Sequence, residues 1–186
     1  MRLKDKVAII TGGSRGIGFA TADAFLREGA KVAVAASSEK NAEAAVEKLK
    51  AIHPDAEVVG ISPNLGSFES VKEEFDKVEK QFGRIDILVN NAGVSESTPF
   101  TSYTEADFDR VIDLNVKGVF NATRAVVDGM IKNHSGVVLN TSSMVSISGQ
   151  PSGFAYPASK FAVNGTTISL ARELGPKGIR VNAVSY

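Results

Sequence analysis

Short apolar runs rich in β-branched residues alternate with longer amphipathic stretches along the whole chain, and this alternation limits the folds available to it. The apolar runs cover 7–10, 31–36, 57–61, 85–89, 136–140 and 179–184, and the helical stretches cover 16–28, 39–52, 67–82, 104–131 and 155–174. The runs are apolar throughout, which indicates strands buried on both faces of a parallel sheet. We therefore predict an α/β fold, with an open, doubly wound parallel sheet between two layers of helices.

Composition restricts the classes of function. A chain of 186 residues suits one domain, residues 1–186. Its 21 basic and 21 acidic side chains cancel, so no net field attracts nucleic acid or an anionic membrane. No cysteine is present, which excludes disulfides and thiolate metal sites. No apolar segment approaches the roughly 20 residues of a membrane span, so we expect a soluble, cytoplasmic protein. We also expect His53 and His134 to face solvent, and no metal to be required.

A glycine-rich turn joins the first apolar run to the first helical stretch. It reads Thr11-Gly12-Gly13-Ser14-Arg15-Gly16-Ile17-Gly18. In such a strand–turn–helix setting, Gly12 makes the tight turn, Gly16 lets the backbone approach a pyrophosphate, and Gly18 lets the helix pack on the strand. The free N–H groups at the start of the helix then face the phosphates. The turn predicts a dinucleotide site and makes the expected fold a three-layer, Rossmann-type α/β/α arrangement.

The end of the second apolar run bears on the choice of dinucleotide. An acidic residue there would accept hydrogen bonds from the ribose 2′-hydroxyl and favour NAD. The run instead ends Ala35-Ala36-Ser37-Ser38. Arg15 and the two serine hydroxyls could bind a 2′-phosphate, and no carboxylate at the tip would repel it. We predict NADP rather than NAD, although Glu39 lies close by and Arg15 could simply be solvated.

Tyr156 and Lys160 are four residues apart at the start of a predicted helix, which puts them on one face. An ammonium beside a phenol favours the phenolate, so such a tyrosine can exchange a proton with a ketone or an alcohol. Ser143 follows the fifth apolar run, and Asn90-Asn91-Ala92-Gly93 ends the fourth. Ligands of open α/β sheets bind at the carboxyl ends of the strands, so these groups should meet beside the glycine turn. Ser142 is a rival of Ser143 for the hydroxyl role.

Together these motifs resemble the short-chain dehydrogenase/reductase family, over nearly the whole chain from Lys6 to about Ser185. The resemblance rests on the glycine turn, on the cluster at 90–93, and on single positions elsewhere. These positions are Asn64, Leu65, Asn115, Ser143, Tyr156 and Lys160.

The resemblance implies a role for each of these residues. Tyr156 would be the acid/base, Lys160 would favour its phenolate form and bind the nicotinamide ribose, and Ser143 would hold the substrate oxygen. Asn115 would anchor a water in a proton relay, a role compatible with a helix kink. Asn64 and Leu65 would border the adenine, and Asn91 would stabilise the sheet beside the cofactor ribose. The expected cofactor-binding set is Gly12, Ser14, Arg15, Gly16, Ile17, Gly18, Ser37, Ser38, Asn64, Leu65, Asn91, Ala92, Gly93, Tyr156 and Lys160.

Members of this family usually continue beyond the sixth strand into a mobile substrate loop, further helices and a seventh strand. Here Val184 and Ser185 are followed by Tyr186 and the chain stops. We therefore expect a fragment of a longer parent that lacks the C-terminal strand and substrate loop. In its full-length form we expect a homo-oligomer, a tetramer or a dimer.

The expected reaction interconverts a small secondary alcohol and a ketone. Two substrate groups remain open: hydroxysteroid (bile-acid) dehydrogenases, which resemble the chain at 59–65 and 152–160, and 3-oxoacyl-acyl-carrier-protein reductases, which resemble it throughout. Docking of a carrier protein would need a basic surface near the pocket. His134 and Lys177 would provide only a small one. The substrate pocket would be lined by residues 95–97 and 144–153. A non-catalytic NADP(H)-binding module is the alternative from another class.

Overall fold

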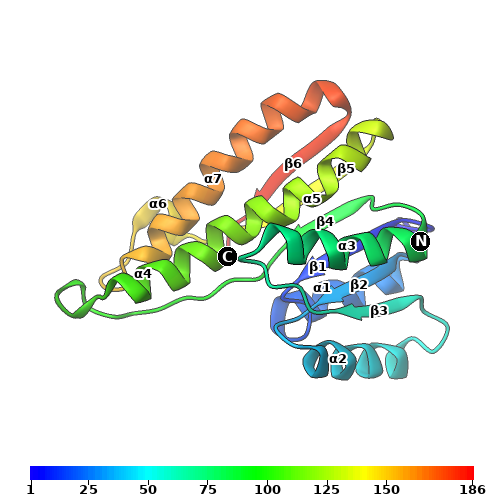
Figure 1. Cartoon of the computed structure of the whole chain (residues 1–186), viewed down its shortest axis with the longest axis horizontal. Coiled ribbons are helices and arrows are strands. Elements are labelled where there is room, and N and C mark those ends of the chain that lie inside the picture. The colour runs from blue at the N-terminus through cyan, green and yellow to red at the C-terminus, as the bar shows by residue number, and fades with distance from the viewer.

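All six strands form one parallel sheet in the computed structural model, which describes residues 1–186 (Figure 1). The strands are β1 (Val7–Thr11), β2 (Lys31–Ala35), β3 (Val58–Ile61), β4 (Ile87–Asn90), β5 (Gly136–Thr141) and β6 (Ile179–Val184). Their spatial order is β3-β2-β1-β4-β5-β6. The order reverses direction between β1 and β4, which creates a crevice at the carboxyl ends of these two strands. The prediction of a Rossmann-type, doubly wound sheet is confirmed.

Helices cover both faces of this sheet. They are α1 (Gly16–Arg27), α2 (Glu39–Ile52), α3 (Phe68–Phe82), α4 (Glu105–Ile112), α5 (Gly118–Lys132), α6 (Val145–Ser148) and α7 (Ala155–Leu174). Strand β1 shows why its residues are apolar throughout. Val7 and Ile9 belong to one buried core, with side chains of α3 and α5, whereas Ala8 and Ile10 belong to a second core, with side chains of α1 and α2.

The outer strands differ from the prediction that every strand is buried on both faces. Along β5 buried and half-buried residues alternate, and β6 is mostly exposed beyond Val181. The helices packed closely on these two strands are α5 and α7, and both contribute side chains to the same core, so they cover the same face. The second face of β5 and β6 has no such helix, so its side chains remain partly accessible. Apolar sequence alone could not reveal this difference, because Val and Leu occur on both faces.

The long helical stretch expected over 104–131 is interrupted. A π-helical segment, Asp113–Lys117, separates α4 from α5, and Asn115 lies at its centre. Such π segments within α-helices are often found at functional sites. A short 3-10 turn, Phe100–Ser102, and helix α6 were not predicted, because three or four residues are too few to show helical periodicity.

The prediction that His53 faces solvent is wrong. It follows α2, and its Nε2 lies 2.7 Å from Oδ1 of Asp23 on α1. Only 19% of its side chain is exposed, so His53 joins the two helices on that face. His134 is exposed in the turn before β5, with a positive φ of 47°.

Candidate active site

A cavity of about 710 Å³ opens at the carboxyl ends of β1, β2, β3 and β4. Most of the residues predicted to bind a dinucleotide line it: Gly12, Ser14, Arg15, Gly16, Ile17, Ser37, Asn64, Leu65, Asn91, Ala92 and Gly93. Gly18, Ser38, Tyr156 and Lys160 belong to the predicted set but do not line this cavity. Its remaining lining residues were not predicted: Ala35, Ala36, Ser62, Pro63, Val94 and Leu114. Ser62 and Pro63 directly follow β3, so the rule of strand carboxyl ends would have found them, whereas Leu114 carries no such signal.

The glycines of the turn have separable roles. Gly12 and Gly16 adopt positive φ angles of 64° and 55°, a region that favours glycine. A Cβ on Gly16 would meet nothing within 4 Å, so this position faces open space in the cavity. A Cβ on Gly18 would overlap the carbonyl oxygen of Gly12 and lie 2.6 Å from Nδ2 of Asn91. Gly18 therefore lets α1 approach β1, and Gly16 leaves room for a ligand.

Replacing Gly18 by Ala should distort the turn, because the atoms it would overlap include backbone. We expect Gly18→Ala to lower the free energy of unfolding by about 1–3 kcal/mol, as overpacking does, and to raise the dissociation constant for NADPH. Urea unfolding and a fluorescence titration with NADPH measure these effects. Gly165→Ala is the matched control, because a Cβ at Gly165 on α7 meets nothing within 4 Å and should stabilise the helix by about 1 kcal/mol. Unchanged stability and affinity in Gly18→Ala would contradict this account of the turn.

The first turn of α1 is suited to an anion. Arg15 occupies the N-cap position in extended conformation, and no side chain caps the helix. The first N–H groups of a helix have no partner within it and carry partial positive charge. They border the same cavity as the hydroxyl of Ser14. The residues present therefore fit the pyrophosphate of a dinucleotide.

Hydrogen bonds fix the ends of β1 and β4 against each other. The hydroxyl of Thr11 accepts from the backbone N–H groups of Asn91 and Ala92, both at 3.0 Å. Nδ2 of Asn91 donates to the carbonyls of Thr11 and Gly12, at 3.1 and 3.2 Å. Asn91 thus joins the end of β4 to the glycine turn.

The serines after β2 lie at different depths. Ser37 lines the cavity, and its Oγ accepts from Nδ2 of Asn41 at 3.3 Å. Oγ of Ser38 accepts from the N–H of Asn41, so Ser38 caps α2. Ala36, at the tip of β2, is buried and borders the cavity at the position where an acidic residue would favour NAD.

The proposed acid/base pair lies on α7. Tyr156 is the second residue of the helix and is half-buried, and Lys160 follows one turn later, with 5% of its surface exposed. Nζ of Lys160 donates to the carbonyl of Thr141 at 2.7 Å and lies 5.7 Å from the centre of the Tyr156 ring. Burial lowers the pKa of the Lys160 ammonium. The structure therefore places a fixed, poorly hydrated cation beside the phenol.

Asn115 lies next to this pair within a set of hydrogen bonds. Its Nδ2 donates to the carbonyl of Val94 at 2.8 Å and to Oγ of Ser159 at 3.0 Å, and its Oδ1 accepts from the N–H of Val94 at 2.9 Å. A Cβ on Gly93 would lie 3.2 Å from Oδ1 of Asn115 and 3.8 Å from Nζ of Lys160. Because Gly93 also lines the cavity, it joins the predicted dinucleotide site to the Lys160–Asn115 group.

The two candidate serines follow β5. Ser142 is buried, its N–H donates to the carbonyl of Val184, and its Oγ has no hydrogen-bond partner. Ser143 is half-buried, and its Oγ donates to the carbonyl of Tyr186 through a long contact of 3.5 Å. Ser143 is thus the more accessible hydroxyl, which favours it over Ser142 for contact with a substrate.

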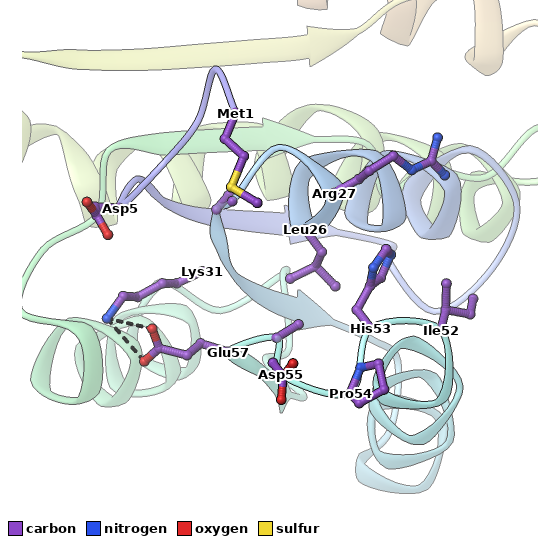
Figure 2. A pocket seen from close by; sticks show the side chains of 13 residues that line it. Met1, Asp5, Leu26, Arg27, Lys31, Ile52, His53, Pro54, Asp55 and Glu57 are labelled. Carbon is purple, nitrogen blue, oxygen red and sulfur yellow. Dashed lines mark hydrogen bonds and ion pairs between the residues drawn. The ribbon is translucent and has the colours of Figure 1, made fainter.

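A smaller cavity of about 420 Å³ lies at the opposite side of the sheet, where the strands begin (Figure 2). Asp5, Lys31 and Glu57 line it at the starts of β1, β2 and β3, and Nζ of Lys31 lies 2.8 Å from the carboxylate of Glu57. This cavity is remote from the glycine turn and contains none of the predicted site residues. Most residues predicted to bind the dinucleotide lie instead at the larger cavity, at the carboxyl ends of the strands.

The strand order and the lining of the larger cavity define a dinucleotide-binding α/β protein. The model of the short chain dehydrogenase family matches residues 6–186, and the chain belongs to this family. Members are NAD(P)-dependent dehydrogenases and reductases that act on CH–OH groups, as the resemblance in sequence predicted.

Individual relatives agree with this assignment. The chain is 53% identical to a 3alpha-hydroxysteroid dehydrogenase of Mediterraneibacter gnavus, over 185 residues that cover 100% of the chain and 74% of the relative. It is 42% identical to a 3-oxoacyl-acyl-carrier-protein reductase of Thermotoga maritima, with the same coverage of both chains. Its fold matches NAD+-bound xylitol dehydrogenase with a TM-score of 0.95 and 35% identity, over 100% of the chain and 71% of the other. Levodione reductase matches with the same TM-score, 37% identity and coverage of 99% and 72%.

Proposed function

We propose that the chain is an NADP(H)-dependent oxidoreductase that interconverts a secondary alcohol and a ketone on a hydroxysteroid of the bile-acid type. The main observation in support of this proposal is the group formed by Tyr156, Lys160 and Asn115. Gly93 joins this group to the cavity beside the glycine turn. Residues 1–186 would act as one dinucleotide-binding and catalytic domain. No helix is both long and apolar enough to cross a membrane, and we take the protein to work in the cytoplasm, as a homo-oligomer in its full-length form.

The chain's own residues would handle the proton. Tyr156 donates its phenolic proton to a ketone oxygen, or accepts the proton of an alcohol in the reverse direction. Lys160 lies beside the ring and stabilises the phenolate, while Ser143 holds the reacting oxygen. The bound nicotinamide supplies or accepts the hydride. The side-chain amide of Asn115 binds Val94 and Ser159 beside Lys160, and Asn115 would anchor the relay water there.

Two observations favour a steroid over a carrier-protein thioester. The identity to the hydroxysteroid dehydrogenase, 53%, exceeds the 42% to the 3-oxoacyl reductase at equal coverage. His134 and Lys177, the basic residues considered for carrier-protein docking, precede β5 and β6 and so lie at the edge of the sheet opposite the cavity. A carrier protein bound there could not deliver its thioester to Tyr156.

The experiment that tests this proposal compares two substrates with NADPH as the reductant. A bile acid with a ketone at C3 and an acetoacetyl thioester are assayed at equal concentration, by loss of NADPH absorbance. We expect a higher kcat/KM for the bile-acid ketone. Preference for the thioester would reverse the substrate assignment, and turnover of neither would favour a non-catalytic NADP(H)-binding module.

The preference for NADP should depend on Arg15 and on the absence of an acid at Ala36. Arg15→Ala removes a charge-assisted hydrogen bond to the 2′-phosphate, which is worth about 1.5–3 kcal/mol, so the dissociation constant for NADPH should rise roughly tenfold to a hundredfold. The constant for NADH should stay within about twofold. Ala36→Asp should weaken NADPH binding and strengthen NADH binding, because a carboxylate repels the phosphate and accepts from the ribose hydroxyl.

Fluorescence titration with each dinucleotide measures these constants. Arg172→Ala is the matched control, because Arg172 is exposed on α7 outside the cavity. Equal loss of NADPH and NADH affinity in Arg15→Ala would contradict a 2′-phosphate contact.

A further inference from the structure

The first residue of α7 is buried, and the helix has no cap of its own. Phe154 occupies the N-cap position and provides no side-chain hydrogen bond, while Ala155, the first helical residue, has no exposed surface. The first N–H groups of a helix need acceptors from elsewhere, and a buried one without an acceptor is costly. Pro157 has no N–H, and the N–H of Ala158 donates to Phe154, so the amides of Ala155 and Tyr156 remain. These two N–H groups therefore need an acceptor from outside the helix.

Tyr103 and Glu96 approach this end from the segment between β4 and α4. Burial raises the pKa of the Tyr103 hydroxyl, the Glu96 carboxylate raises it further, and the Ala155 amide lowers it. The ring of Tyr103 also packs edge-on against that of Phe154, the N-cap residue of α7, so Tyr103 lies beside the start of this helix. The Tyr103 hydroxyl and Oε1 of Glu96 are both buried, and neither makes a hydrogen bond of normal length and angle. Both atoms are therefore available to each other and to the helix.

The segment before α7 is joined to the segment that carries Glu96. Nε2 of Gln150 donates to the carbonyl of Glu96 at 3.1 Å and to that of Gly153 at 2.8 Å, and the N–H of Gly153 donates to the carbonyl of Thr98 at 3.0 Å. A Cβ on Gly153, whose φ is +84°, would overlap the Glu96 carbonyl. Any side chain at position 153 would push the two segments apart.

Aromatic side chains also pack between the segment before α4 and the start of α7. The ring of Phe154 lies 6.3 Å from that of Tyr103, 5.6 Å from Phe100 and 6.1 Å from Phe108, measured between ring centres. Pairs at these separations attract each other beyond the area that they bury. Tyr103 is thus packed beside the start of α7 through its ring.

We propose that Tyr103 and Glu96 are positioning residues, which together cap the N-terminus of α7 from outside the helix and so hold Tyr156 in place. The Tyr103 hydroxyl is available to accept from the N–H of Ala155 and to donate to Oε1 of Glu96, because neither oxygen is engaged by another group. The Glu96 carboxylate adds negative charge at the positive end of the helix dipole. Tyr156 is the next residue after Ala155, so movement of the first turn would move the phenol relative to Lys160.

Amide exchange tests the cap without reference to activity. We expect Tyr103→Phe, which removes only the hydroxyl, to speed hydrogen exchange at the Ala155 amide by about tenfold, a shift in local opening of about 1.4 kcal/mol. Amides in the last turn of α7 should be unchanged. Two-dimensional NMR of the whole chain resolves these positions, and Tyr186→Phe, at an exposed tyrosine, is the matched control. Unchanged exchange at Ala155 in Tyr103→Phe would overturn the proposal.

Two substitutions at Glu96 separate capping from general packing. Glu96→Gln keeps an oxygen that accepts from Tyr103 and should retain most of the protection at Ala155, whereas Glu96→Ala should lose it. If both substitutions raise exchange equally along all of α7, the residue acts on overall stability and the cap is excluded.

The effect on turnover rests on the proposed function. Tyr103→Phe should lower kcat about threefold to tenfold, while the dissociation constant for NADPH stays unchanged. The reason is that the substitution disturbs only the position of Tyr156. A loss of NADPH affinity as large as the loss of kcat would contradict a positioning role. If the unmodified chain shows no turnover that depends on Tyr156, the proposed function fails, while the exchange experiment still decides the cap.

Discussion

Replacing Tyr156 by Phe should reduce turnover of the bile-acid ketone by about 10²–10⁴-fold, the usual contribution of a positioned acid/base. The substitution removes one hydroxyl from a half-buried side chain and leaves the ring beside Nζ of Lys160. NADPH should still bind with a dissociation constant within about twofold of the original, because the cavity lining does not include Tyr156. Loss of the rate with retained binding is the signature of a proton donor.

Steady-state rates and an NADPH titration on the same sample measure both effects. Tyr186→Phe is the matched control, because it also removes only a phenolic oxygen, from an exposed residue whose backbone carbonyl stays in place for Ser143. A Tyr156→Phe protein with an unchanged rate would exclude the acid/base role. If the unmodified chain binds NADPH but reduces neither substrate, a non-catalytic dinucleotide-binding module becomes the better description.

Replacing Lys160 by Met should reduce turnover by about 10²–10³-fold, the usual cost of removing one electrostatic donor from an active site. The same substitution should change the pH dependence of stability. Burial lowers the pKa of Lys160 from its ordinary value of 10.5, so over part of the range below 10.5 the unfolded chain binds a proton that the folded chain has lost. The free energy of unfolding of the unmodified chain therefore rises with pH through this range, as the cost of the buried charge disappears. Lys160→Met should lack that rise.

Thermal unfolding of both proteins between about pH 7 and about pH 10 measures the difference. Lys48→Met is the matched control, because Lys48 is exposed on α2 and its pH dependence should match that of the unmodified chain. A Lys160→Met protein that keeps both its rate and the pH slope would show that the ammonium takes part in neither. A stability loss without a rate loss would assign Lys160 a purely structural role, through its hydrogen bond to Thr141.

Much of the candidate site followed from sequence, because its signals are local. The glycine turn lies between a strand and a helix, and each glycine has a backbone reason that spacing alone suggests. The pairing of Tyr156 with Lys160 follows from the period of a helix, and α7 has the bounds predicted for it, Ala155–Leu174. The parallel arrangement of the strands also followed from the alternation of elements, because parallel strands need crossover helices, whereas the order of the strands came from the structure.

Other features depend on contacts between distant parts of the chain. The π-helical turn that contains Asn115 meets Val94 and Ser159, and no periodicity in residues 104–131 indicates this interruption. The inward position of His53 depends on Asp23 on another helix. The partial exposure of β5 and β6 depends on where the helices lie. None of these could be predicted from one segment considered alone.

The sequence by itself determined the class of fold, the dinucleotide turn and the chemical types of the acid/base pair, because these depend on backbone geometry and side-chain spacing within single elements. Only the tertiary structure decided that Gly93 joins Lys160 and Asn115 to the cavity and that Tyr103 packs beside Phe154 at the start of α7. Such juxtapositions arise from packing between segments far apart in the chain, where burial and unpaired polar groups make one arrangement more stable than its alternatives.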